Sequence, residues 1–483
     1  MKKLAALFIL ACFHLLPLPA QERFRKSAPV PDPLQDLKLP AVQTLRLTNG
    51  LTLSVVQRRN LPLMNLQLII FAGESVSPDP LPGLATLTAE MISRGTAELS
   101  IDKIEERVEA LGGTFQCNTS FEYSVFSLNF LESRFEQALE VLGLILLQPT
   151  FPERELTYLK MTNFYELLQK NRDPEHVAKR QLFRTLFRKH PFEKALFNED
   201  LLKNISRKDV QSFYQKYYRP NNAQLVLTGN LSDQRASRNV SRYLQTWMPG
   251  EVPPISYQPP ALEAEGKETV CFIDHPGTKD AILYLGQMIF PPSSPDIFPF
   301  LVLNQVLGGT PNSRLFMNLR ESKGYAYYVF SELEFSTTAG MFIIRAKVRP
   351  DTLVPSLQEI SREITRLSRE KILTYEIEQA KSYVIGHYPL QLEGWDRFSF
   401  KAAQINAFFN LGEDHWNRFY ENIATVDAAR VSESAQKYLL TQPVTVICGD
   451  LNTLARRLWE INRVDVYDQK GNFLYTMSKG EKR

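Results

Sequence analysis

Hydrophobic residues in the first half of the chain recur with two different periods. The segments that alternate with the two-residue period of strands are residues 45–57, 64–74 and 114–131. The segments with the wider apolar spacing of helices are residues 83–94, 100–111 and about 133–217. Asn49-Gly50 lies within the first strand-like segment and predicts a hairpin turn there. Strands mixed with long helices predict an α+β fold.

The second half of the chain repeats the end of the first. ISRKDVQSFYQKYYRPNNAQLVLTGNLS begins at Ile205, and the similar segment VDAARVSESAQKYLLTQPVTVICGDLN begins at Val426. Both segments predict a helix, then a strand, then Gly-Asn-Leu or Gly-Asp-Leu. A repeat of this length indicates a duplicated domain rather than a solenoid. We therefore expect two homologous domains, each a mostly antiparallel sheet with helices packed on one face.

Proline-rich segments without periodicity mark the expected domain boundaries. The predicted order is a signal peptide at 1–20, an extended proline-rich arm at 21–44, a first domain at 45–249, a linker at 250–268, a second domain at 269–455 and a tail at 456–483. The tail contains Lys470-Gly471, which predicts a terminal hairpin.

The first twenty residues have the composition of a secretory signal. Two lysines precede an apolar run from Leu4 to Leu18, and the small residue Ala20 ends the segment. This pattern predicts export across the inner membrane and a periplasmic location. Cys12 could instead be a lipid-attachment site, but the apolar run continues past it. No later segment of the sequence is long and apolar enough for a membrane span.

Composition narrows the possible functions. The chain has 483 residues, 44% of them hydrophobic and 23% charged, which is ordinary for a globular protein of two to four domains. The 56 Lys and Arg residues nearly balance the 53 Asp and Glu residues, which argues against a nucleic-acid partner. Cys117, Cys271 and Cys448 lie far apart in apolar segments, so we expect buried thiols rather than a metal site or a disulfide framework.

The histidines exclude the common zinc peptidase motifs. No two of them lie within five residues of each other, so neither H-E-x-x-H nor H-x-x-E-H is present. The six histidines are His14, His176, His190, His275, His387 and His415.

Residues 83–96, GLATLTAEMISRGT, resemble the zinc helix of the pitrilysin and insulinase peptidase family, M16. That helix carries H-x-x-E-H between a Gly-Leu-Ala opening and a Gly-Thr close. The three motif positions here are Thr86, Ala89 and Glu90. They would share one face of a helix, but Thr86 and Ala89 offer no strong zinc ligand. The resemblance therefore implies a vacated zinc site and no cofactor in this chain.

The third zinc ligand of that family is a Glu on a later helix. Glu155 and Glu166 lie in the corresponding region, but neither belongs to the family's usual pair of adjacent acids. The sequence alone leaves open which of them, if either, matches that ligand.

Residues 313–334, SRLFMNLRESKGYAYYVFSELE, resemble a second segment of the family, S-R-L-x-x-x-L-R-x-x-x-G-x-A-Y. The resemblance implies that Arg320 and Tyr327 reach a substrate carbonyl beside the zinc. A guanidinium and a phenol are donors that can stabilise an oxyanion. The same residues could also serve packing, since Arg suits the last turn of a helix and Tyr suits a strand. Arg314 we interpret as structural.

The resemblance spans about Leu45 to Leu451 and implies paired α/β units that enclose an unfolded peptide. The zinc motif is lost, but the segment with Arg320 and Tyr327 is kept. We therefore expect this chain to be the zinc-free subunit of a heterodimeric metallopeptidase. Its partner would contain H-x-x-E-H and supply the zinc, and Arg320 and Tyr327 would act across the closed cavity. The alternative is a non-catalytic peptide-binding or scaffolding protein with the same fold. A stand-alone hydrolase with another nucleophile or metal has no supporting motif.

Overall fold

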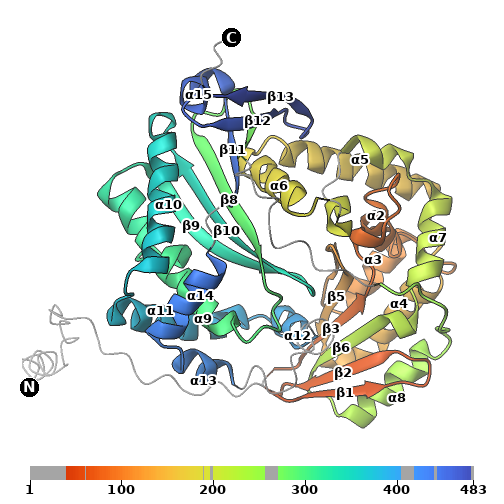
Figure 1. The fold of residues 1–483 in the computed structure, drawn as a ribbon. Coiled ribbons are helices and arrows are strands. Elements are labelled where there is room, and N and C mark those ends of the chain that lie inside the picture. The colour runs from red at the N-terminus through yellow and green to blue at the C-terminus, as the bar shows by residue number, and fades with distance from the viewer. Residues whose placement is uncertain are drawn as a thin grey trace, which may run out of the picture. The chain divides into compact units, whose positions relative to one another are not determined.

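Two β-sheets, one in each half of the chain, organise the structure (Figure 1). The computed structural model describes residues 40–59, 61–188, 190–195, 199–255, 270–403, 418–439 and 443–479. All of them belong to one compact unit, residues 38–483. The predicted signal peptide with Cys12, most of the predicted arm and most of the predicted linker lie outside the described residues, as does His415.

The first sheet has the strand order β1-β2-β6-β3-β5-β4 in the described part of the chain. Its strands are β1 (Val42–Arg46), β2 (Thr52–Gln57), β3 (Leu63–Ile70), β4 (Phe115–Thr119), β5 (Ser124–Leu131) and β6 (Ala223–Gly229). β2 and β6 run parallel, and the other neighbours are antiparallel. β1 and β2 form the hairpin predicted around Asn49-Gly50, and Gly50 has the positive φ of 88° that such a turn needs.

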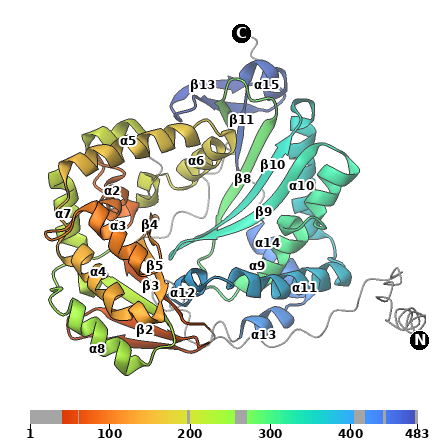
Figure 2. The same cartoon turned by 180° about the vertical axis from the view of Figure 1, so that it is seen from behind.

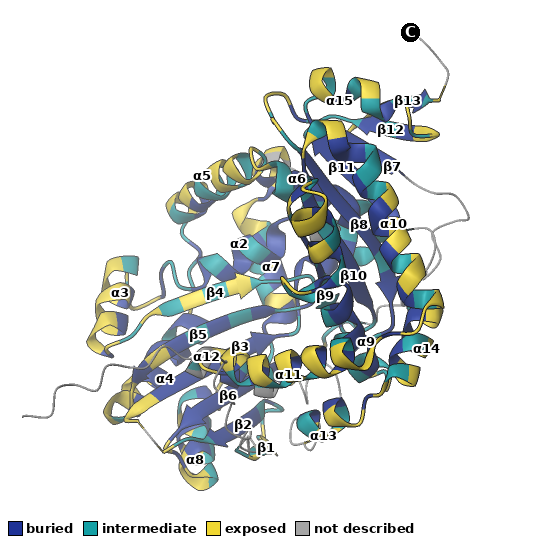
Figure 3. Cartoon of the chain, turned by 90° about the vertical axis from the view of Figure 1, so that its left-hand side faces the viewer, coloured by how far each residue is buried: buried dark blue, intermediate teal, exposed yellow. Residues whose placement is uncertain are grey.

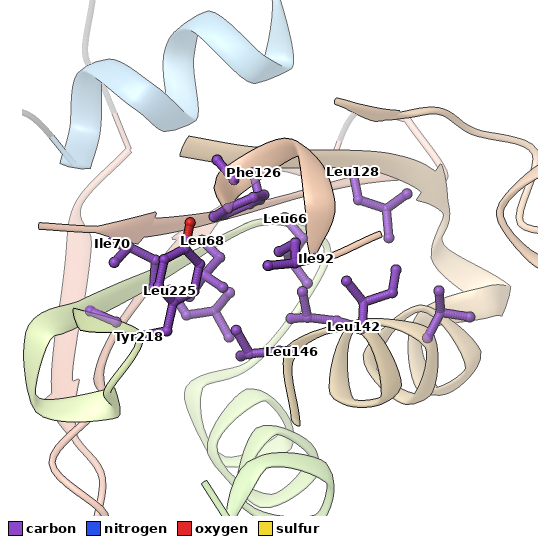
Figure 4. Packing of buried hydrophobic residues seen from close by; sticks show 14 of the residues in the cluster. Leu66, Leu68, Ile70, Ile92, Phe126, Leu128, Leu142, Leu146, Tyr218 and Leu225 are labelled. Atoms are coloured by element: carbon purple, nitrogen blue, oxygen red, sulfur yellow. The ribbon is translucent and has the colours of Figure 1, made fainter. Parts of the chain in front are cut away.

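Helices cover one face of this sheet. They are α2 (Leu84–Met91), α3 (Ile101–Ala110), α4 (Phe135–Leu147), α5 (Glu153–Lys170), α7 (Arg207–Tyr217) and α8 (Asp233–Leu244), with the short helices η1 (Glu74–Val76), η2 (Glu132–Arg134), η4 (Glu199–Asn204) and η5 (Pro220–Asn222). Strand alternation sends Leu66 and Leu68 of β3 into the core with Leu142 and Leu146 of α4 (Figure 4). The intervening Gln67 lies on the opposite face of the sheet.

The second sheet has the order β13-β12-β7-β11-β8-β10-β9 among the described residues. Its strands are β7 (Val270–Asp274), β8 (Ala281–Ile289), β9 (Ala326–Phe335), β10 (Gly340–Val348), β11 (Val444–Gly449), β12 (Arg463–Tyr467) and β13 (Phe473–Ser478). β7 pairs in parallel with β11 and β12, and the remaining pairs are antiparallel. β9 forms one edge, which Figure 2 shows beside β10.

Another set of helices belongs to this half. They are α9 (Ile297–Asn304), α10 (Leu353–Arg369), α11 (Thr374–Gln391), α13 (Phe419–Ala424), α14 (Ala428–Tyr438) and α15 (Leu451–Leu458), with the short helix η8 (Pro350–Thr352) and two π-helical segments, η6 (Gln305–Gly309) and η7 (Phe316–Ser322). Both sheets are largely buried, whereas exposed residues gather on outer helices such as α5 and α11 (Figure 3). No helix in the described residues is long and apolar enough to cross a membrane.

The two halves share one architecture. The order β2-β6-β3-β5-β4 of the first sheet matches β7-β11-β8-β10-β9 of the second. α5 and α11 both have 18 residues. Their first residues, Glu153 and Thr374, are separated in the sequence by the same number of residues as the repeated segments that begin at Ile205 and Val426. α7 and α14 both have 11 residues and start at the same interval. This confirms the predicted α+β fold of two homologous domains.

One helix of each half packs on the sheet of the other half, which the sequence analysis did not predict. α6 (Pro174–Leu186) lies against β8 and β11, where Leu182 joins a buried cluster with Ile282 and Val446. α12 (Trp395–Ala403), its counterpart in the repeat, lies against β3, β6 and β2. There Ser399 donates a buried hydrogen bond of 2.6 Å to Thr228. Each sheet therefore has helices of its own half on one face and an exchanged helix on the other.

The turn between β4 and β5 also joins the halves. Phe121 stacks on Phe192 of the short helix η3 (Pro191–Ala195), with 5.1 Å between ring centroids. The neighbouring Glu122 accepts hydrogen bonds from the backbone N–H of Thr337, at 3.1 and 3.2 Å. Thr337 lies in the turn between β9 and β10, so the edge hairpins of the two sheets meet at their tips.

The C-terminal strands β12 and β13 pair as a hairpin and extend the second sheet past β7. Gly471 in their turn has a φ of 81°. Arg184 of α6 donates to the Lys470 carbonyl at 3.1 Å. The hairpin therefore contacts the helix that the first half contributes to this sheet.

Candidate functional site

The three positions of the vacated zinc motif lie on α2, as expected, but their environments differ. α2 begins after Gly83, whose φ of 89° lies in the left-handed region that favours glycine. Ala89 is 1% exposed and belongs to the first hydrophobic core. Thr86 and Glu90 are half-buried. The position that holds the catalytic Glu in the resembled family is therefore occupied by a core methyl group.

A buried carboxylate, Glu74, occupies the space beside Thr86. It accepts hydrogen bonds from the Thr86 hydroxyl and, at 2.7 Å, from the Thr86 N–H. It also accepts from the Gly83 N–H at 3.0 Å and from the Ser77 hydroxyl at 2.9 Å. Burial raises the pKa of Glu74, and these hydrogen bonds oppose that shift. Glu74 caps the first turn of α2 and engages the hydroxyl of Thr86.

The sequence analysis missed Glu74. The two backbone groups that it caps belong to Gly83 and Thr86, well beyond the three-residue reach of the usual capping patterns. Its one sequence signal is an acid in the polar segment that leads into the Gly83 turn.

Glu90 is held by a residue of α5. Its carboxylate accepts a hydrogen bond of 2.7 Å from the Asn163 side-chain amide. Burial raises the pKa of Glu90, and the negative charge of Glu166 raises it further. Glu166 is thus the acid that α5 brings near the vacated motif, while Glu155 lies about three turns earlier on the same helix.

These residues do not fit a zinc ion. The Thr86 hydroxyl donates to Glu74, Ala89 offers no lone pair, and Glu90 is engaged by Asn163. Structural and catalytic zinc sites need at least three imidazole, thiolate or carboxylate ligands. In the part of the chain that the structure describes, no group of three His, Cys, Asp or Glu side chains could hold a metal ion.

We expect the purified chain to retain less than about one-tenth of a zinc ion per molecule after dialysis against a mild chelator, because the vacated motif offers no imidazole or thiolate and the Glu74 and Glu90 carboxylates already accept hydrogen bonds. The measurement is elemental analysis by mass spectrometry. The control is Thr86→His/Glu90→His, in which two imidazoles and Glu166 are expected to retain close to one zinc. Stoichiometric zinc in the unaltered chain would contradict the assignment of a vacated site.

Arg320 lies in the second half, in the last turn of η7. Its side chain is 49% exposed, and its guanidinium lies 4.7 Å from the ring centroid of Phe316. Its Nε lies 3.9 Å from the Glu321 carboxylate, which is a long contact for an ion pair. Its donors therefore remain accessible to an acceptor from outside the chain.

Tyr327 lies at the start of β9 and is 56% exposed. In the pairing of β9 with β10, Val348 is opposite Ala326 and Lys347 is opposite Tyr328, so Tyr327 is the extra residue of a β-bulge. Bulges redirect side chains at sheet edges and next to active sites. The Lys347 ammonium lies 5.7 Å from the centroid of the Tyr327 ring.

Arg314 makes the contact expected of a structural residue. Its guanidinium binds the Glu376 carboxylate of α11 through two hydrogen bonds, of 2.7 and 2.8 Å. Both side chains are largely buried, at 12% and 14% exposure. Burial alone would raise the pKa of Glu376, but the bonds from Arg314 and the Leu373 N–H outweigh it, and the pKa is lowered.

The cysteines in the described part of the chain, Cys117, Cys271 and Cys448, are free thiols. Cys271 and Cys448 are buried, as predicted, and burial raises the pKa of both. Cys117 on the edge strand β4 is only half-buried. Burial, followed by the nearby charge of Glu90, raises its pKa to about 12, so this thiol is not activated.

The structure thus brings Glu74, Thr86, Glu90, Asn163 and Glu166 together in the first half, between α2 and α5. It places Arg320 and Tyr327 in the second half, at the edge of the other sheet. The first group has carboxylates but no imidazole, and the second has two exposed hydrogen-bond donors.

Comparisons with known proteins identify the family of this chain. Residues 55–200 match the family model "Insulinase (Peptidase family M16)", and residues 204–384 match "Peptidase M16 inactive domain". A Bacillus subtilis protein named as an uncharacterized zinc protease is 26% identical over 64% of this chain and 75% of its own length. A Helicobacter pylori protein named as a non-peptidase homolog is 26% identical over 69% of this chain and 76% of its own length.

A crystal structure described as a peptidase M16 inactive domain from Pseudomonas fluorescens has the same fold. Its TM-score is 0.77 at 24% identity, covering 85% of this chain and 98% of that one. With the family models, this similarity confirms the resemblance that residues 83–96 and 313–334 indicated. The chain belongs to peptidase family M16.

Proposed function

We propose that this chain is the exported, zinc-free subunit of a heterodimeric M16 peptidase in the periplasm. The observation that carries the proposal is the combination of a vacated zinc motif with an exposed donor pair, Arg320 and Tyr327. A partner chain with H-x-x-E-H would supply the zinc. This chain alone would be inactive.

The donor pair suits the chemistry of peptide hydrolysis. Attack on a peptide carbonyl places negative charge on its oxygen, and donors aimed at that oxygen stabilise the charge. Arg320 offers a guanidinium whose contact with the Glu321 carboxylate is long, at 3.9 Å, and Tyr327 offers an exposed phenol at a β-bulge. Zinc on the partner would polarise the same carbonyl and activate water.

Free sheet edges support an unfolded peptide as the substrate. Among the described residues, β4 ends the first sheet and β9 ends the second, so each has backbone groups that face away from the sheet. An extended peptide can pair with such an edge through its backbone, whereas most backbone groups of a folded protein are already paired. Tyr327 lies on the β9 edge itself.

The test is co-expression with an M16 chain of the same organism that contains H-x-x-E-H, followed by cleavage assays on an unfolded fluorogenic peptide. Arg320→Ala is expected to lower kcat/KM by about 10²–10³-fold, the usual cost of losing one oxyanion donor. Tyr327→Phe should lower it by at least about tenfold, since it removes only the hydroxyl.

Matched controls are Arg242→Ala and Tyr375→Phe, which alter similarly exposed side chains elsewhere, at 68% and 61% exposure. Both should leave turnover unchanged. If Arg320→Ala and Tyr327→Phe also leave it unchanged while the two chains still associate, the chain is a peptide-binding or scaffolding subunit instead.

A further inference from the structure

The segment that carries Arg320 has an unusual backbone. η7 is a π-helix from Phe316 to Ser322, and the Lys323 N–H bonds to the Asn318 carbonyl, five positions earlier, at 3.0 Å. π-helical turns are rare, cost stability and are common at functional sites. Such a turn needs contacts from outside the helix to maintain it.

Those contacts come from α10. The Asn318 amide donates to Glu359 at 3.0 Å and to Glu363 at 2.7 Å. The Lys323 ammonium, at the end of the turn, lies 2.8 Å from Glu359. The two glutamates are 11% and 3% exposed, so one buried pair of carboxylates holds both the middle and the end of η7.

The helical geometry of η7 sets the direction of Arg320 relative to Asn318 and Phe316. With about 4.4 residues per π-helical turn, a residue two positions after Asn318 points to nearly the opposite side of the helix. A residue four positions after Phe316 lies almost directly above it, which accounts for the 4.7 Å between the guanidinium and the Phe316 ring. Asn318 and Lys323 thus anchor one side of η7, and the other side presents Arg320.

We infer that Asn318 is a positioning residue that orients Arg320 by tying η7 to Glu359 and Glu363 of α10. The inference rests on the proposed function, because Arg320 matters for turnover only if it reaches the substrate. An amide suits this role since it donates to two carboxylates that repel each other along one face of α10.

Asn318→Asp tests the inference in the assembled two-chain peptidase. The substitution keeps the shape of the side chain but replaces the donor with a third carboxylate, which the two glutamates repel. We expect kcat and kcat/KM to fall together by between about tenfold and about a hundredfold, as for a contact made in the transition state. Arg362→Ala is the control, because it removes a 65% exposed partner of Glu359 and leaves Asn318 in place.

Two further variants separate positioning from general damage to the fold. In the double variant Asn318→Asp/Glu363→Gln, the amide at position 363 can donate to the carboxylate at position 318, so the donor and the acceptor exchange places. This variant should recover most of the lost activity. In the Arg320→Ala background, Asn318→Asp should cost little more, because residues that act through one group are not additive.

The outcomes distinguish the inference from the function on which it rests. If Arg320→Ala leaves turnover unchanged, the proposed function fails. If Arg320→Ala lowers turnover but Asn318→Asp does not, Asn318 does not act through Arg320. The same conclusion follows if the fold-loss of the double variant equals the product of the two single fold-losses. Thermal unfolding of each variant identifies any loss that comes from unfolding alone.

Discussion

Replacing Arg314 by Ala is expected to lower the free energy of unfolding by about 3–5 kcal/mol. The guanidinium forms two hydrogen bonds with Glu376, and both side chains are largely buried. Without Arg314, the Glu376 carboxylate stays in a poorly solvated position with one hydrogen bond, from the Leu373 N–H. Urea denaturation followed by circular dichroism measures the loss.

The control for Arg314→Ala is Arg457→Ala, which removes an exposed ion pair with Glu460, at 36% and 44% exposure. It should cost less than about 1 kcal/mol. The double variant Arg314→Met/Glu376→Leu replaces both charges with apolar groups of similar length and should recover much of the stability. A loss below about 1 kcal/mol for Arg314→Ala itself would show that water solvates the pair.

Replacing Glu74 by Ala is also expected to lower the free energy of unfolding. The truncation leaves the N–H groups of Gly83 and Thr86 without the acceptor that caps α2. Each buried donor that loses its partner costs about 1–3 kcal/mol. The expected loss therefore lies between the cost of leaving one such donor unpaired and the cost of leaving two unpaired. Asp173→Ala is the matched control, because Asp173 caps α6 through one exposed hydrogen bond and should cost about 1 kcal/mol. Equal losses in the two variants, measured by urea denaturation, would contradict the role of Glu74.

The pH dependence gives a second measurement at Glu74. Burial raises the pKa of Glu74 in the folded chain above its ordinary value of 4.5. The folded chain then holds a proton that the unfolded chain releases, so stability falls as the pH rises through this window. Glu74→Gln cannot titrate. The stability of the unaltered chain minus that of Glu74→Gln should therefore be larger near pH 4 than near pH 7, and a constant difference would contradict the raised pKa.

The sequence predicted the fold class because each half has strong local patterns. Asn49-Gly50 marks a hairpin, and the repeat that begins at Ile205 and Val426 predicts two domains of one architecture. The exchange of α6 and α12 could not be predicted in this way. Periodicity shows that a helix has an apolar face, but it does not identify the sheet that the face covers.

The candidate site was predictable only where a motif spans a short stretch of sequence. Thr86, Ala89 and Glu90 lie on α2 as expected, and Arg320 and Tyr327 lie on η7 and β9, where their role as substrate contacts stays a prediction from the resemblance. Glu74 and Asn163 were missed because their partners lie far from them in the sequence. The β-bulge at Tyr327 and the π-helix at Arg320 have no signature in composition, since both depend on contacts with other elements.

The exchanged helices also bear on how the chain could be divided. A cut between residues 255 and 270 would separate the two homologous halves, yet each fragment would keep the helix that the other needs. Each sheet would expose a face, and each fragment would carry an amphipathic helix with nothing to cover. The two fragments should therefore be soluble only when they are produced together, which makes a split-protein complementation assay possible in this scaffold.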